Sequence, residues 1–298
     1  MDWLIEPFEL AFQQRALLGG ALASVGLALV GTWVVVRGMS FLGDALVHGV
    51  IPGIALAVLL DFNPMVGAAL AAAVMIGGIN LVRRQTAFSE DTSIGLLFVG
   101  MLALGVILIS RTDSYQGSLT GILFGDALGV TAGDIGVLAV VAAVSLVATL
   151  VFYRPFIALS FNEQKAQLLG FRPKLTHALM LGLMTLTIVA SFQTVGTLLV
   201  FGLLVGPPAT AALLARRLPT IMATAALIGI LSVAAGLLVS FHANVSGSAT
   251  MAGMPIALFF VVLGVRAAVD RTRQGATELS VATDEAAGDG DPVGAAPR

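Results

Sequence analysis

The chain has 298 residues, of which 58% are hydrophobic and 11% are charged, and its mean hydropathy is +1.00. A soluble domain of this size could not hide so much apolar surface, and the absence of cysteine excludes disulfides, thiolate metal sites and thiol nucleophiles. The formal net charge is −2 and basic residues form no cluster, so nothing in the sequence indicates nucleic-acid binding.

Apolar stretches close to the ~20 residues that a helix needs to cross a bilayer recur along the whole chain. They lack the period-2 alternation of a membrane barrel, so we predict an all-α, polytopic membrane helix bundle. About nine spans (eight to nine) are expected, at residues 16–36, 40–60, 65–82, 92–110, 135–152, 175–192, 195–215, 221–241 and 249–265.

Two segments depart from a simple succession of spans. Residues 175–215 form one nearly continuous apolar tract that is too long for a single crossing, and a polar break from Ser191 to Thr194 divides it into two short helices. Residues 113–130, "DSYQGSLTGILFGDALGV", are too polar and too rich in glycine to span. We expect this segment to be re-entrant or to lie on the membrane surface.

The basic residues predict the orientation of the chain. With the N-terminus outside and nine alternating spans, 13 of the 15 basic residues lie inside, and Arg15 and Arg111 stay outside. We therefore expect an extracytoplasmic segment at 1–15, a transmembrane domain at 16–268 and a cytoplasmic C-terminus. Residues 269–298 are rich in alanine, glycine and acids, which predicts a disordered tail.

One predicted cytoplasmic loop, residues 154–174, is longer than the others: "RPFIALSFNEQKAQLLGFRPK". Residues from Phe161 to Leu169 are amphipathic at helical spacing, and Gly170 offers a C-terminal stop. The polar face of this short helix is available to a partner, although a helix lying on lipid headgroups would show the same pattern. The chain has no GxxxxGK[ST] motif, so ATP-driven transport would need another chain to bind the nucleotide.

Asp44 and His48 interrupt the apolar sequence of the second predicted span. A carboxylate at mid-bilayer costs roughly 2.5–3.5 kcal/mol, so a function is expected of it. At i and i+4 the two side chains share one helix face, and their oxygen and nitrogen donors suit Zn²⁺ or Mn²⁺. Two ligands are too few for a closed site, but a twofold dimer would present two of each. The alternative is a structural hydrogen bond between neutral His48 and Asp44.

Pro52 and Gly53 follow one turn later. Proline within a helix removes a hydrogen bond and tends to bend the helix. The freed carbonyls are tolerated in a membrane only beside protein or a water-filled cavity. We therefore expect a kink here, beside a transport pathway and suited to act as a hinge.

Other ionisable residues are weaker candidates. His242, near the outer end of the eighth span, and Asp126, near the outer surface, could receive or attract the ion, but their positions favour a solvated role for both. His177, at the cytoplasmic start of the sixth span, is interpreted as structural. Glu90 and Asp91 precede the fourth span, where acids favour a helix N-terminus.

Several stretches together resemble the membrane permeases of bacterial ABC importers for zinc, manganese or iron. They are "MSFLGDALVHGVIPGIALA" (39–57), "SEDTSIGLLFVGMLALGVILIS" (89–110), "FNEQKAQLLGF" (161–171) and "TVGTLLVFGLLVGPPATAALLARRL" (194–218). The resemblance covers roughly residues 15–268, and the paired Asp and His followed by Pro-Gly is its most specific motif. Residues 239–250 match only loosely, and His242 stands where the family has no fixed histidine. In residues 123–131, Asp126 stands where relatives more often have a neutral residue.

The resemblance implies a permease of the cobalamin-importer-like (type II) architecture in a bacterial plasma membrane. It implies a homodimer, two cytoplasmic ATPases and an extracytoplasmic metal-binding protein, with lipid around the spans. It assigns Asp44 and His48 to the metal path and residues 161–171 to ATPase docking. The residues that match this docking region are Asn162, Glu163, Gln164, Lys165 and Gly170.

The chain is then a transport subunit and not an enzyme, with no permanent cofactor and with Zn²⁺, Mn²⁺ or Fe²⁺ as the transported ion. One alternative is a permease for a siderophore or corrinoid, although a bulky substrate needs a largely uncharged cavity. An ion-coupled metal carrier should show inverted repeats, and we find none that is convincing. An intramembrane hydrolase would need HExxH or facing aspartates, which are absent.

Overall fold

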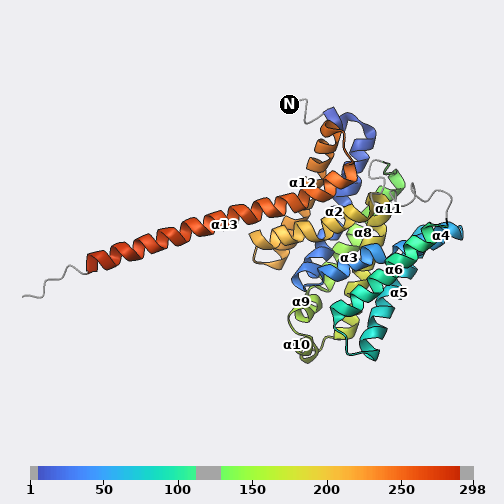
Figure 1. Cartoon of the computed structure of the whole chain (residues 1–298), viewed down its shortest axis with the longest axis horizontal. Coiled ribbons are helices and arrows are strands. Elements are labelled where there is room, and N and C mark those ends of the chain that lie inside the picture. The colour runs from blue at the N-terminus through green and yellow to red at the C-terminus, as the bar shows by residue number, and fades with distance from the viewer. Residues whose placement is uncertain (1–5, 112–128, 289–298) are drawn as a thin grey trace, which may run out of the picture.

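The computed structural model describes residues 6–111 and 129–288, and these residues form helices joined by short turns (Figure 1). The elements are η1 (Glu6–Glu9), α2 (Ala11–Val36), α3 (Ser40–Gly49), α4 (Ile51–Leu59), α5 (Pro64–Gln85), α6 (Glu90–Ile109), α8 (Ala132–Val151), α9 (Tyr153–Phe161), α10 (Glu163–Leu168), α11 (Pro173–Leu214), α12 (Leu218–Ala243) and α13 (Gly247–Gly288).

Within the described ranges, nine helical segments are long and apolar enough to cross a membrane. Each of them overlaps one predicted span, which confirms the all-α membrane bundle. The predicted surface or re-entrant segment 113–130 falls almost entirely in residues 112–128, outside the described part of the chain.

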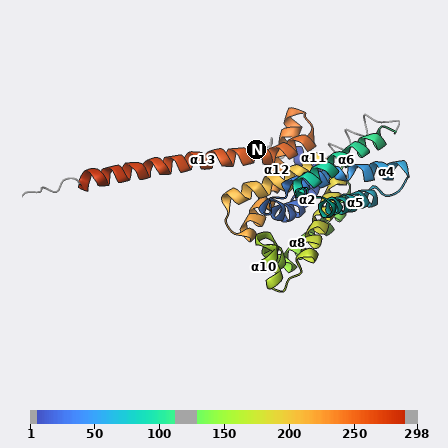
Figure 2. The ribbon, with the colours of Figure 1, turned by 60° about the horizontal axis from the view of Figure 1, so that its bottom comes forward.

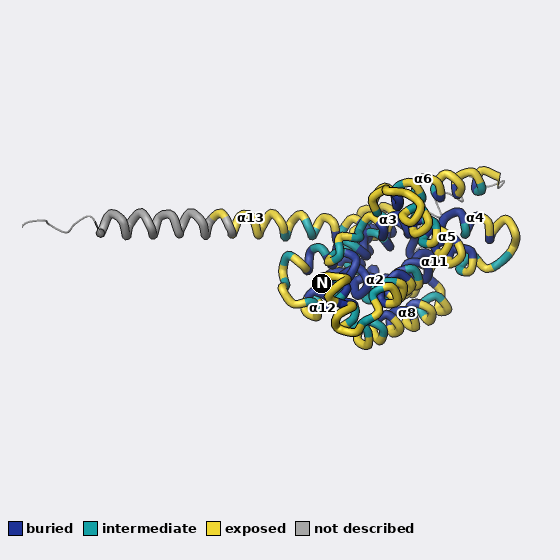
Figure 3. Tube along the Cα trace, turned by 90° about the horizontal axis from the view of Figure 1, so that it is seen from below, coloured by how far each residue is buried: buried dark blue, intermediate teal, exposed yellow. Residues whose placement is uncertain are grey.

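Helix α2 forms the centre of the bundle, packed between α11, α12 and α8. In its apolar window 72% of the residues are buried, against 11% in the window of α13, which lies at the periphery. Figure 3 shows the buried positions gathered in the interior and the exposed ones on the outer faces. Trp33 is fully buried near the end of α2 and meets Tyr153 and Phe156 edge-on, with ring centroids 6.0 and 5.4 Å apart. These ring contacts pack α9 against α2.

The second span is divided into α3 and α4 at Val50, two residues before Pro52. Proline is favourable in the first turn of a helix, where its missing N–H is not needed. Gly53 has a second role, because α4 crosses α5 at Gly53 and Gly67. A side chain on either glycine would overlap the carbonyl oxygen of the other. The span that carries Asp44 and His48 is therefore fixed tightly against α5.

The long apolar tract 175–215 contains two spans, Pro173–Phe192 and Val195–Leu214, as predicted. The chain turns at Gly196, whose φ of 79° and ψ of 165° are not helical. The change of direction thus falls just after the polar residues that predicted it, at a residue that tolerates positive φ.

Helix α13 extends away from the bundle as a single rod and stays helical to Gly288 (Figures 1 and 2). This differs from the disorder expected for 269–298. Alanine, glutamate, arginine and glutamine favour helical backbone, and a helix satisfies its own hydrogen bonds without a core. Residues 289–298 lie outside the described ranges, and the division of the chain into domains stays a prediction.

Candidate functional site

Helix α3 places Asp44 and His48 on one face, as their spacing predicts. Asp44 Oδ1 lies 3.6 Å from His48 Nε2, and the two side chains are 28% and 25% exposed, respectively. This distance is beyond that of a hydrogen bond, so the two groups do not satisfy each other. A carboxylate oxygen and an imidazole nitrogen, both able to ligate a metal ion, are thus held side by side within a membrane span.

The remaining residues of α3 anchor this pair to the bundle. Helix α3 packs chiefly against α6 and α11, with Leu42, Ala45 and Leu46 buried. The ring of Phe98 in α6 meets the His48 imidazole edge-on, with centroids 6.0 Å apart. This contact sets the direction of the imidazole ring and leaves its Nε2 beside Asp44.

One chain supplies only part of a metal site. In residues 6–111 and 129–288, as far as side chains are described, no group of three or more His, Asp or Glu residues could hold a metal ion. Asp44 and His48 are therefore an incomplete ligand set, which a second chain or water would have to complete.

The structure does not bring the weaker candidates to this pair. His242 lies in the last turn of α12 beside Phe241, with ring centroids 5.3 Å apart. The main packing partners of α12 are α2, α11 and α13, whereas α3 packs on α6 and α11. Asp126 lies outside the described residues.

The segment predicted to dock an ATPase consists of two short helices. The expectation of one helix from Phe161 to Leu169 is wrong at its start, because Phe161 ends α9 and Asn162 is extended. The Asn162 side-chain oxygen accepts a hydrogen bond of 3.0 Å from the backbone N–H of Lys165 and so caps α10. Cap formation competes with helix continuation at asparagine, which explains the break. Gly170, with φ of 82°, follows α10 as predicted.

Both polar and apolar side chains of this segment face outward. Glu163, Gln164 and Lys165 are exposed. So are three apolar residues: Phe161 is 80% exposed, Leu168 87% and Leu169 68%. In contrast, Ala166 is buried. Large apolar side chains with this exposure mark a contact surface for protein or membrane.

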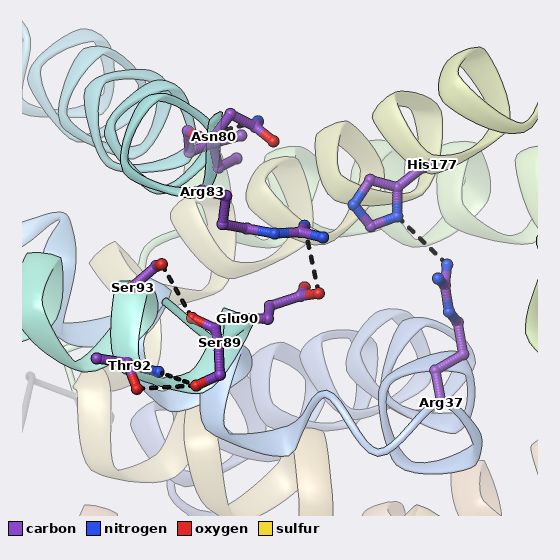
Figure 4. Close-up of polar contacts among 9 residues, drawn as sticks. Arg37, Asn80, Arg83, Ser89, Glu90, Thr92, Ser93 and His177 are labelled. Carbon is purple, nitrogen blue, oxygen red and sulfur yellow. Dashed lines mark hydrogen bonds and ion pairs between the residues drawn. The ribbon is translucent and has the colours of Figure 1, made fainter. Parts of the chain in front are cut away.

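A polar cluster that sequence reasoning missed lies at the ends of α2, α5, α6 and α11 (Figure 4). Arg37 Nη1 is 3.4 Å from His177 Nδ1, and Arg83 Nη1 is 3.2 Å from Glu90 Oε2. Burial lowers the pKa of Arg37 below its ordinary value, and the charges of Glu90 and Glu163 oppose this shift. All of these residues lie at the predicted cytoplasmic side. Glu163 is on the predicted docking segment, and the others are within a few residues of the end of an apolar stretch. That shared position was the signal that could have revealed the cluster.

The interpretation of Glu90 and Asp91 as residues of a helix start agrees with the structure. Both lie in the first turn of α6. Ser89 is the N-cap residue, and its hydroxyl accepts a hydrogen bond of 3.1 Å from the N–H of Thr92. Glu90 also pairs with Arg83 and so joins α6 to α5.

Comparison with known proteins identifies the family to which this architecture belongs. The ABC 3 transport family matches residues 9–266. The chain belongs to this family. This confirms the resemblance seen in the motifs, and the chain is a multi-pass transport subunit.

Individual relatives agree over most of the chain. The manganese transport system membrane protein MntC of Listeria monocytogenes is 33% identical over 253 residues, 85% of this chain and 90% of that protein. A probable iron transport system membrane protein of Haemophilus influenzae is 32% identical over 88% of this chain and 96% of its own length. The solved structure of PsaBC from Streptococcus pneumoniae in complex with Fab has a TM-score of 0.80 and 30% identity, and covers 87% of this chain and 94% of that chain.

Proposed function

We propose that this protein is the membrane permease of an ATP-driven importer of divalent transition-metal ions, and that the ion passes Asp44 and His48. The observation that carries the proposal is the pair itself, an oxygen and a nitrogen donor 3.6 Å apart and partly exposed within a span. Ionisable residues within membrane spans are rare and mark ion or substrate pathways.

Manganese and iron are the ions that fit best. The relatives from L. monocytogenes and H. influenzae are named for manganese and iron transport. A carboxylate and an imidazole suit Mn²⁺ and Fe²⁺, and the chain has no thiolate that would favour a softer ion. Zinc is supported by the donor chemistry alone.

We infer that a second permease copy completes the metal site. Each chain contributes one carboxylate and one imidazole, and a twofold axis beside α3 would bring two of each around one ion. Such a site can exchange its ligands with water, which suits a conduit because an ion held too tightly would not leave. We therefore propose a homodimer with the ion at its axis.

The other partners follow from the surface and the family. Residues 161–170 present exposed apolar and polar side chains that fit a cytoplasmic ATPase, which would supply the energy of transport. An extracytoplasmic metal-binding protein would deliver the ion on the opposite side. In this arrangement the protein lies in the bacterial plasma membrane with its N-terminus outside, as the basic residues predict.

The test is uptake of radioactive manganese, iron and zinc, measured separately in vesicles that contain this chain with its ATPase and binding protein. Asp44→Asn and His48→Ala should each abolish ATP-dependent uptake while the complex still assembles. Asp61→Asn is a matched control, because it removes a carboxylate outside the pair. Asn tolerates the left-handed backbone of Asp61, whose φ is 54°.

Normal uptake by both Asp44→Asn and His48→Ala would show that the pair serves packing and would remove the proposed site. Uptake of a metal chelate but of no free ion would favour a permease for siderophores or corrinoids. Uptake that needs an ion gradient and no ATP would favour a secondary carrier.

A further inference from the structure

A groove of about 860 Å³ lies between α5 and α11, apart from the Asp44–His48 pair. Its walls are one face of each helix, from Ala73 to Arg84 on α5 and from Lys174 to Gly182 on α11. On α11 the lining positions follow each other at helical spacing, so the groove runs along that helix for roughly 12 Å.

The groove is basic at one end and mainly apolar along the rest. The C-terminal end of α5 lies beside the N-terminal end of α11. Arg83 and Arg84 of α5 and Lys174 and His177 of α11 therefore line the same end of the groove. Further along, the walls are alanine, glycine and aliphatic side chains together with Asn80, whose amide donates a hydrogen bond of 3.0 Å to the Ile76 carbonyl. The groove is therefore amphipathic, and its charged end lies at the predicted cytoplasmic side.

The apolar part of the groove is open. A Cβ atom added to Gly77 on α5 or to Gly182 on α11 would meet no atom within 4 Å. At the crossing of Gly53 and Gly67, in contrast, the glycines allow backbone contact. Small residues in the groove thus leave space between the helices, and in a bilayer the material that fills an apolar space is an acyl chain.

Two cations at the basic end have no ion-pair partner among the described residues. Among the residues that the structure describes, Arg83 pairs with Glu90, whereas Arg84 and Lys174 have no carboxylate oxygen within 4.0 Å. Both side chains are exposed. Arginine and lysine in such a position bind phosphate oxygens.

We propose that this groove binds one anionic phospholipid of the inner leaflet, with its phosphate on Arg84 and Lys174 and an acyl chain along Gly77 and Gly182. Basic pockets between membrane helices at the cytoplasmic side recognise lipid headgroups in this way. A soluble phosphate would use the basic end and leave the apolar walls unfilled. A second protein helix would need acidic groups at one end and an apolar face beyond them.

The test measures lipid retained by the purified transporter complex, by native mass spectrometry after equilibration with phosphatidylglycerol and phosphatidylcholine in equal amounts. The wild type should retain one phosphatidylglycerol per permease chain in preference to phosphatidylcholine. Replacing both cations, Arg84→Gln with Lys174→Gln, should weaken retention about 30-fold, from the attraction of each basic residue for anionic lipid. Gly182→Leu should fill the groove and remove both lipids.

Matched controls come from other parts of the chain. Arg216→Gln with Arg217→Gln removes two exposed basic residues before α12. Gly253→Leu places a large side chain at a glycine of α13 that is equally open. Both control proteins should retain phosphatidylglycerol as the wild type does. If the Gly182→Leu protein fails to assemble, the double substitution of Arg84 and Lys174 still tests whether these cations bind the lipid.

Three results would overturn the proposal. Unchanged retention of phosphatidylglycerol in the Arg84 and Lys174 variant would show that these cations do not bind lipid. Displacement of the lipid by inorganic phosphate would indicate a site for small anions. Disulfide cross-linking between two copies of Ala178→Cys, a clean assay in a chain without cysteine, would show that the groove is covered by the second permease.

Discussion

Gly53 of α4 and Gly67 of α5 touch backbone to backbone, so that a methyl group on either would collide with the carbonyl oxygen of the other. This contact fixes the second half of the span that bears Asp44 and His48. The helix pair is therefore a rigid support for the proposed ion pathway, and the interruption at Val50 lies between this support and the ligands.

Gly67→Ala should destabilise the protein because the backbones of α4 and α5 would have to move apart. Overpacking of this kind costs roughly 1–3 kcal/mol. The measurement is thermal unfolding of the purified transporter complex in detergent. Gly100→Ala is the control, since a Cβ at Gly100 meets nothing within 4 Å and alanine favours a helix over glycine. Equal unfolding temperatures for the two variants would contradict the close contact.

Gly196→Ala should destabilise the protein for a different reason. The φ of 79° and ψ of 165° at Gly196 belong to a region that only glycine occupies readily, and forcing another residue there costs roughly 1–3 kcal/mol. The same thermal unfolding assay applies, with Gly253→Ala as the control, since a Cβ at this glycine of α13 meets nothing within 4 Å. A Gly196→Ala protein as stable as the control would mean that the turn between the two spans lies elsewhere.

The sequence predicted the spans well because hydropathy over ~20 residues reports directly on the bilayer. It also predicted the division of 175–215, since polar residues interrupt the apolar tract there. It could not identify Gly196 as the turning residue, because many glycines of this chain are helical. The close approach of Gly53 and Gly67 also depends on how two helices cross, which no local pattern contains.

The candidate site was predictable in part. The i, i+4 spacing of Asp44 and His48 is a local property, and α3 keeps it. The contact of Phe98 with His48 and the cluster of Arg37, Arg83, Glu90 and His177 join helices that are distant in sequence. Their sequence signal was limited to a shared position near the ends of the spans.

Asn162→Ala should loosen α10 without unfolding the bundle. The substitution removes the cap on the Lys165 N–H, which contributes about 1 kcal/mol to helix stability, and α10 has only six residues. We expect the ATPase activity of the complex to respond less to the metal-binding protein. Asn162→Asp should restore the response, because aspartate caps equally well. Equal loss in both variants would show that the amide itself contacts the partner.

The exposed apolar residues of the docking segment should be needed for ATPase binding. Phe161→Asp and Leu168→Asp change side chains that are 80% and 87% exposed, so the fold should tolerate both. The few anchor side chains that dominate an interface each contribute about 2 kcal/mol or more, so we expect the affinity for the ATPase to fall by about 30-fold or more. Binding of the purified ATPase to the permease in nanodiscs measures this. Phe88→Asp, at a 55% exposed phenylalanine in the turn between α5 and α6, is the control. Unchanged affinity in both variants would assign these side chains to the lipid headgroups, the alternative that the amphipathic pattern left open.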